Sequence, residues 1–198
     1  MVIFRPVLAL LVCTLLAACT TVEVSRFEQV PSERVDHAYI RSGADFSRFT
    51  AVLPGTVSVW TPSAAAGVDA AALAQLQALY EVVLTEALAG DGAYAIAAGR
   101  GPGVLELQTQ FINLRGVQDP LSVQALQRRY SFPLEPGRGT LVVDLIDATS
   151  GEVLAHVADV EDAAEYARAL EPGAAEAAVR ETLARWAGVL REFLDEAR

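Results

Sequence analysis

The chain has 198 residues, of which 53% are hydrophobic, and carries a formal net charge of −10 at pH 7. This length fits one domain of ordinary size with a sizeable core. Binding to nucleic acids or anionic lipid surfaces requires clustered positive charge, which so acidic a chain lacks. We therefore expect no nucleic-acid partner. Every cation is an arginine, and the absence of lysine excludes Schiff-base chemistry and a P-loop lysine.

Residues 1–18 have the layout of an export signal. A basic start at Arg5 is followed by an apolar run over residues 7–16 and by small residues just before Cys19. The run is too short to cross a hydrocarbon core, which takes roughly 20 residues in a helix. We therefore expect a signal peptide over 1–18 rather than a membrane-spanning anchor.

The residues Leu16-Ala17-Ala18-Cys19 resemble the lipobox of bacterial lipoproteins. The resemblance implies cleavage between Ala18 and Cys19 and acylation of Cys19, and two or more acyl chains hold a protein firmly to a membrane. Thr20 stands where an aspartate would resemble an inner-membrane retention signal, which favours the periplasmic face of the outer membrane. A soluble secreted protein is the alternative.

The two cysteines have different expected fates. Cys13 leaves with the signal and Cys19 is used up by lipid, so the mature chain has neither a free thiol nor a disulfide. Cysteine nucleophiles, thiol redox centres and cysteine-ligated metals are excluded with them.

Residues 19–45 are polar and charged and predict a lipidated N-terminus and tether in front of a single periplasmic domain over 46–198. The alternative is that part of this segment packs along the domain as an edge strand. The domain opens with an extended piece near 49–53 and a strand over 56–61, in which Val57 and Val59 alternate with polar neighbours.

A helix is predicted over 68–90, with Asp69 at its start and Gly90 after its end. Its apolar stripe consists of Leu73, Leu76, Tyr80, Val83 and Leu84. Two strands, 93–98 and 104–114, flank the stretch GRGPG at 99–103. Because this stretch lies between two strands and not before a helix, we predict a wide hairpin turn there rather than an anion-binding loop.

The second half of the chain predicts a loop with a short helix around 123–128, then a hairpin over 140–163 that turns at DATSGE. A last helix runs from about Pro172 to Ala197, with a stripe of Val179, Leu183, Trp186, Leu190 and Phe193. The order of elements predicts an α/β (α+β) fold, a two-layer sandwich in which two amphipathic helices pack on one face of a mostly antiparallel sheet.

Candidate catalytic residues are few. His37 and His156 are the only histidines and neither lies in a nucleophile motif, while Asp144 and Asp147 would form an acid pair only through the register of the hairpin. We therefore predict no catalytic residue and no cofactor. A run of carboxylates lacks the spacing of a calcium loop, so we predict a solvated acidic turn and no metal at Asp159, Glu161, Asp162 and Glu165.

The two tryptophans receive different predictions. Trp186 lies on a helix stripe and is expected in the core, whereas Trp60 falls on the opposite side of its strand from the two valines. Exposed aromatic side chains mark binding surfaces. The candidate partner surface therefore consists of Trp60, Arg128, Arg129 and Tyr130.

Four stretches, LQALYEVVLTEAL, GPGVLELQTQFINL, VVDLIDATSGEVLAHVAD and RWAGVLREFLDEA, resemble a family of proteobacterial lipoproteins of unknown function. Together they span about residues 45–196. The resemblance implies helices packed on a sheet, no established activity, and no functional residue to carry over except the lipidation cysteine, Cys19. The chain also looks distantly like periplasmic lipoprotein domains that assist envelope assembly or transport machines.

The leading hypothesis is a non-enzymatic outer-membrane lipoprotein, attached to the membrane by its acyl chains, whose domain binds a protein partner in envelope maintenance or transport. One alternative is a carrier of lipids or small molecules with an apolar pocket between helices and sheet. Another is an uncharacterised hydrolase that works with carboxylates.

Overall fold

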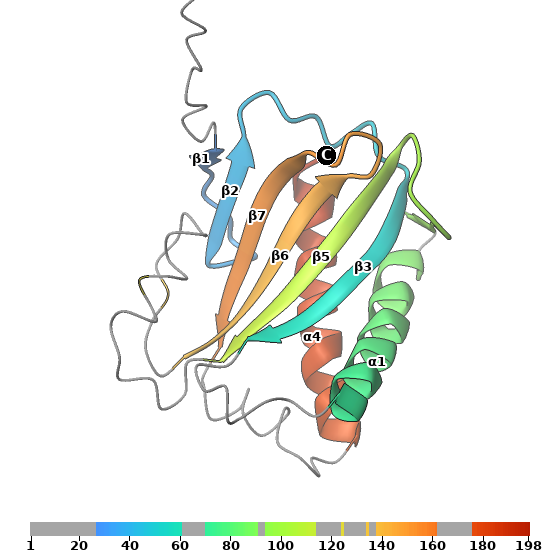
Figure 1. Ribbon diagram of the computed structural model, residues 1–198. Coiled ribbons are helices and arrows are strands. Elements are labelled where there is room, and N and C mark those ends of the chain that lie inside the picture. The colour runs from blue at the N-terminus through green and yellow to red at the C-terminus, as the bar shows by residue number, and fades with distance from the viewer. Residues whose placement is uncertain are drawn as a thin grey trace, which may run out of the picture.

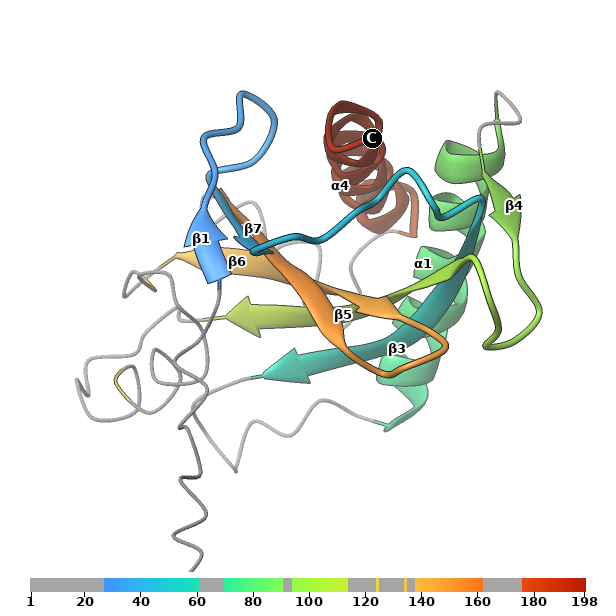
Figure 2. The same ribbon diagram turned by 90° about the horizontal axis from the view of Figure 1, so that it is seen from above.

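The structure is a computed structural model, and it describes residues 27–60, 70–90, 94–113, 138–161 and 176–198 together with residues 124 and 134. Within these ranges the chain forms a seven-stranded sheet with two helices on one face (Figures 1 and 2). The expected fold, an α/β sandwich with a mostly antiparallel sheet, is confirmed. Neither helix is long and apolar enough to cross a membrane.

The elements follow one another as β1 (Phe27–Gln29), β2 (His37–Arg41), β3 (Ala51–Trp60), α1 (Ala70–Ala89), β4 (Ala95–Ile96), β5 (Val104–Asn113), β6 (Gly139–Asp147), β7 (Val153–Glu161) and α4 (Glu176–Glu196). The strand order across the sheet is β1-β2-β7-β6-β5-β3-β4. β3 runs parallel to β5 and β4, and all other neighbours are antiparallel. Parallel neighbours need a crossover connection, and α1 supplies it between β3 and β5.

Most predicted elements are present with small shifts of their ends. The helix expected over 68–90 is α1, the last helix is α4, and the hairpin at DATSGE joins β6 to β7. The two extended pieces near 49–53 and 56–61 are one strand, β3, whose register with β5 shifts between Pro54 and Val57. The helix expected around 123–128, the cap at Asp69 and the start at Pro172 lie outside the described residues.

The prediction of a hairpin turn at residues 99–103 is wrong. β4 and β5 do not pair with each other, because both run parallel to β3 and lie on its two sides. The connection instead passes the start of β3, where the carbonyl oxygen of Gly103 accepts hydrogen bonds from the amides of Thr50 and Ala51 at 3.1 and 3.3 Å. The sequence shows two extended pieces but not which strand each one pairs with.

Part of the segment expected to be a tether belongs to the sheet. Over residues 27–41 the chain forms β1 and β2, and β2 pairs with β7 so that Tyr39 lies opposite His156. Of the two alternatives for residues 19–45, the edge strand is therefore the one that the structure shows for this part. The signal and Cys19 lie outside the described residues.

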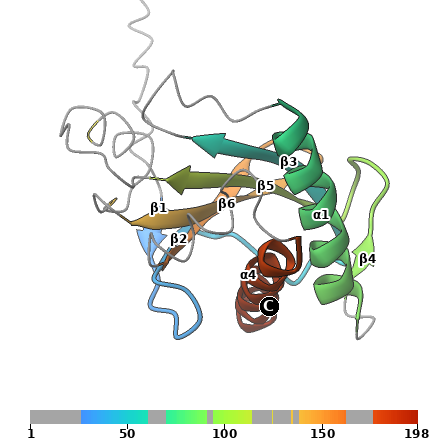
Figure 3. The ribbon, with the colours of Figure 1, turned by 90° about the horizontal axis from the view of Figure 1, so that it is seen from below.

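The core lies between the sheet and the two helices, as Figure 3 shows from below. At its centre Phe111 of β5 contacts one aromatic residue from each helix. The ring of Trp186 stacks on it at a centroid distance of 5.2 Å, and the ring of Tyr80 meets it edge-on at 5.9 Å. Val179 of the predicted stripes is partly buried, the other stripe residues whose side chains the structure describes are buried, and Trp186 is in the core as expected.

One hydrogen bond crosses this apolar core. The Thr109 hydroxyl of β5 donates to the Tyr80 hydroxyl of α1 at 3.0 Å, and both residues are buried. Burial raises the pKa of Tyr80 to about 12, so the phenol stays neutral at any physiological pH. The bond satisfies two polar groups that would otherwise be buried without a partner.

The β6–β7 turn is held by a single carboxylate. Asp147 Oδ1 accepts hydrogen bonds from the amides of Thr149 at 2.7 Å and Ser150 at 3.3 Å, and Arg48 pairs with Oδ2 at 2.7 Å. Gly151 completes the turn with a φ of 74°, which a side chain would disfavour. Burial alone would raise the pKa of Asp147, but these hydrogen bonds and Arg48 outweigh it and lower the pKa below its usual value of 3.8.

We expect Thr109→Val and Tyr80→Phe each to lower the free energy of unfolding by about 1–3 kcal/mol, because each leaves a buried hydroxyl without its partner. The double variant should lose clearly less than the sum of the two single losses, since neither polar group then remains. Denaturant unfolding of the four chains measures this coupling. Additive losses would show that the bond contributes nothing.

We expect Asp147→Asn to lower the free energy of unfolding by about 1 kcal/mol at neutral pH, because the ionised carboxylate is the stronger acceptor in the turn. A lowered native pKa stabilises the fold fully above the usual value of 3.8 and ceases to do so as the pH falls through the native pKa. The difference between the two chains should therefore shrink below about pH 4 in urea titrations. A difference independent of pH would contradict the assignment.

Candidate functional site on the helix-free face

The second face of the sheet, which is turned toward the viewer in Figure 1, is covered by neither α1 nor α4. We call it the helix-free face. Side chains alternate along a strand, so the residues between the core positions point to it. On this face a polar row crosses five strands, with Thr56 and Ser58 in β3, Gln108 and Gln110 in β5, Asp144 in β6, His156 in β7 and Tyr39 in β2.

Hydrogen bonds tie the row together from strand to strand. Gln108 donates its side-chain amide to the Thr56 hydroxyl at 3.2 Å, and Gln110 donates to the Ser58 hydroxyl at 3.4 Å. Both pairs lie between β5 and β3. These bonds hold donors and acceptors in fixed positions on the helix-free face, where Gln108 and Thr56 are exposed.

His156 contacts side chains of β6 and β1. Its Nδ1 lies 2.8 Å from Asp144 Oδ1, and both side chains are only 15% exposed. The Phe27 ring of β1 packs against the imidazole at a centroid distance of 4.6 Å, and the Arg41 guanidinium lies over the Phe27 ring, 5.0 Å from its centroid. The pair therefore joins β7 to β6 and fastens the edge strand β1 to the sheet.

The His156–Asp144 pair was not predicted. Asp144 lies three residues before the turn at DATSGE and His156 four residues after it, so a regular hairpin would not pair them. The register shift between Leu145 and Ile146 places the two residues opposite each other. The pair is half of a nucleophile-activating set. However, the hydroxyl of Ser58 lies three strands away, about 14 Å at ordinary strand spacing, and the side chains found against His156 are Phe27 and Asp144.

Trp60 lies at one end of this face. It is partly buried and packs with Tyr39 against a small second apolar cluster formed by Ile112, Leu134, Val142 and Ala158. The sequence placed Trp60 on the side of β3 away from Val57 and Val59, and the structure has it there. The other members of the predicted partner surface, Arg128, Arg129 and Tyr130, lie outside the described residues.

The described part of the chain holds no group of three or more histidine, cysteine, aspartate or glutamate side chains that could bind a metal ion. The predicted acidic turn is wrong for Asp159 and Glu161, which lie in β7, while residues 162 and 165 are outside the described ranges. On the helix-free face the carboxylate of Glu106 is occupied by Arg100, at 2.7 Å.

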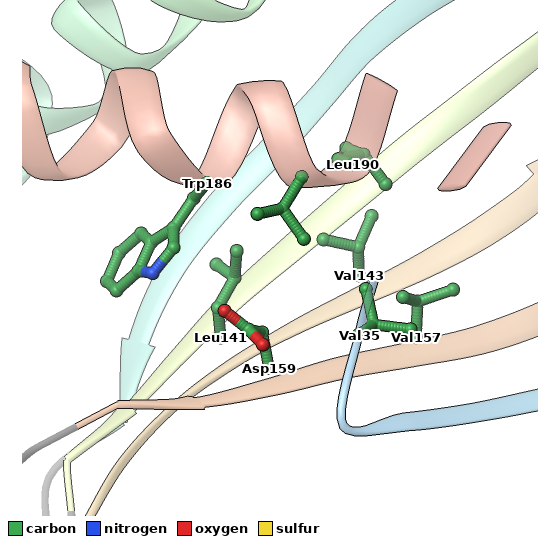
Figure 4. Close-up of a pocket in the computed structure, with 8 residues that line it drawn as sticks. Val35, Leu141, Val143, Val157, Asp159, Trp186 and Leu190 are labelled. Atoms are coloured by element: carbon green, nitrogen blue, oxygen red, sulfur yellow. The ribbon is translucent and has the colours of Figure 1, made fainter. Parts of the chain in front are cut away.

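An apolar hollow lies between α4 and the sheet, where the carrier alternative requires a pocket. Figure 4 shows Trp186 and Leu190 of α4 facing Leu141, Val143, Val157 and the Asp159 carboxylate, with Val35 at the rim. Its interior volume is about 10 Å³, room for one water molecule. Ligand pockets have volumes of roughly 300–1,000 Å³.

The fold and the helix-free face together define a two-layer α/β domain whose sheet is covered by helices on one side. The model of a family described as "Protein of unknown function (DUF3313)" matches residues 21–187, and the chain belongs to this family. No curated protein matches the sequence.

Two solved structures of the PelC dodecamer from Paraburkholderia phytofirmans are similar to this chain over most of the length of the PelC chain. A point variant in space group C2 is 15% identical, with 78% of this chain and 95% of that chain covered and a TM-score of 0.33. The second, in space group P6, is 16% identical, with 73% and 89% covered and a TM-score of 0.32. TM-scores of this size do not establish a common architecture.

Proposed function

We propose that this protein is a non-enzymatic lipoprotein of proteobacteria, anchored through Cys19 to the periplasmic face of the outer membrane. Its domain binds a protein partner in envelope maintenance or transport through the helix-free face. The lipobox at residues 16–19 supports the anchor. The observation that supports the binding role is a sheet that is covered by helices on one face and carries an ordered polar row on the other.

The chemistry of the helix-free face is that of a protein-binding surface. Protein interfaces combine aromatic anchors with side chains that form hydrogen bonds at their rim. Here the partly buried rings of Tyr39 and Trp60 share one face of the sheet with the exposed amide of Gln108. The net charge of −10 favours a partner whose contact surface is neutral or basic, because like charges across an interface slow association.

The geometry favours this function over the two alternatives. A lipid or small-molecule carrier needs far more space than the hollow of about 10 Å³ beneath α4. A hydrolase using His156 would need a nucleophile within hydrogen-bond reach of the imidazole. In the structure Asp144 contacts Nδ1 of the imidazole and the Phe27 ring packs against it, while the Ser58 hydroxyl lies three strands away.

We expect Cys19→Ala to abolish incorporation of labelled palmitate and to release the protein from the membrane fraction, because the thiol is the acylation site. Cys13→Ala is the matched control and should leave both readouts unchanged, since Cys13 lies inside the signal. Labelling and fractionation of intact cells measure both effects. Palmitate incorporation by the Cys19→Ala chain would contradict the anchor assignment.

The binding face is tested with a photo-crosslinking amino acid in place of Gln108, which is exposed on the helix-free face. We expect illumination of intact cells to yield a discrete adduct of one additional protein. The matched control replaces Glu81, which is exposed on α1 at the opposite side of the molecule, and should yield none. Adducts at Glu81 but not at Gln108 would show that the partner binds the helices instead.

A further inference from the structure

The two edges of the sheet differ in how they are protected. Exposed edge strands pair readily with other chains, and proteins block them with charges, prolines, bulges or very short strands. The edge at β1 is blocked in this way, since β1 has three residues and presents the exposed Glu28 and Gln29. The opposite edge, at β3, lacks this protection over half its length.

β3 pairs with β5 over residues 51–54 and 57–60, but on its other side it pairs with β4 only at Ala51 and Val52. No described strand lies beside residues 56–60 on that side. Pro54 and the register shift that follows it separate this part from β4. Residues 56–60, Thr-Val-Ser-Val-Trp, carry no charge and no proline, and all but the serine have strong β-propensity.

We propose that a second copy of this chain pairs with this edge, so that two β3 strands lie antiparallel across a twofold axis at Ser58. The segment is self-complementary in that register. Val57 of one copy lies opposite Val59 of the other on the core side, and Thr56 lies opposite Trp60 on the helix-free side. Pairs of β-branched and aromatic residues are the favourable cross-strand pairs of a sheet. A twofold axis uses the same segment of both copies.

Charge and neighbouring surface also suit a second copy. The chain has a net charge of −10, yet the segment at the seam is neutral, so like charges do not meet there. The adjacent helix α1 leaves Ala74, Ala78 and Val82 exposed, with Val82 at 47%. A seam of five residues is nevertheless smaller than a standard interface of about 1,600 Å². The dimer is therefore reversible and dissociates on dilution.

The test is disulfide trapping in the full chain, in intact envelopes, with a mild oxidant. Ser58→Cys places two thiols opposite each other at the axis, with Cβ atoms about 5 Å apart. Gln110→Cys is the matched control, because Gln110 pairs with Ser58 on the same face one strand further in. Two such thiols would lie about 15 Å apart across the seam, too far for a disulfide.

We expect a disulfide-linked species of twice the chain mass for Ser58→Cys and none for Gln110→Cys. Adding Thr56→Lys, at an exposed edge position, should reduce this species at least tenfold, because a charge at the edge opposes pairing. Circular dichroism confirms that each variant is folded. Light scattering of the parent chain over a range of concentrations should show a monomer–dimer equilibrium.

Three results would overturn the proposal. They are equal trapping at both positions, no trapping at Ser58→Cys in a folded chain, and trapping of a different protein at the β3 edge. The proposal does not depend on the lipid anchor or on the partner of the helix-free face. A chain that carries both Cys19→Ala and Ser58→Cys should form the same disulfide-linked dimer. Failure of the dimer proposal and failure of the proposed function are therefore distinguishable.

Discussion

Phe111 occupies the centre of the domain, and the arrangement of the other elements depends on its contacts. Trp186 of α4 stacks on its ring and Tyr80 of α1 meets its edge, and all three side chains are almost completely buried. One aromatic side chain of β5 thus draws both helices to the same face of the sheet. The Arg180–Glu86 ion pair, at 2.8 Å, then joins the two helices at the periphery, where solvent leaves it little energy to contribute.

This one-sided packing decides what the other face of the sheet can contain. Neither helix covers it, and beside the second apolar cluster it carries polar residues of β3, β5, β6 and β7 that form hydrogen bonds between neighbouring strands. The His156–Asp144 pair and the Phe27 ring extend this network to the N-terminal edge strand. The polar row on this face is thus fixed by bonds between strands that are neighbours in the sheet.

Those parts of the fold that depend on local periodicity were predictable from the sequence. The stripes of α1 and α4, the alternation along β5 and the turn at DATSGE each follow from residues within a dozen positions of one another. Glu106 departs from the alternation, since it faces away from the core yet is buried and paired with Arg100. The hairpin expected at residues 99–103 failed because strand neighbours far apart in the sequence cannot be found from periodicity.

The sequence by itself determined the class of fold and the chemistries that are absent, because amphipathic patterns and the lack of lysine are visible residue by residue. It left open whether residues 27–41 join the sheet, and it did not bring His156 and Asp144 together. Only the tertiary structure decided these points, together with the face that α1 and α4 leave uncovered and the part of the β3 edge beside which no described strand lies. The physical reason is that strand order and face coverage arise from long-range packing around Phe111, which local sequence does not encode.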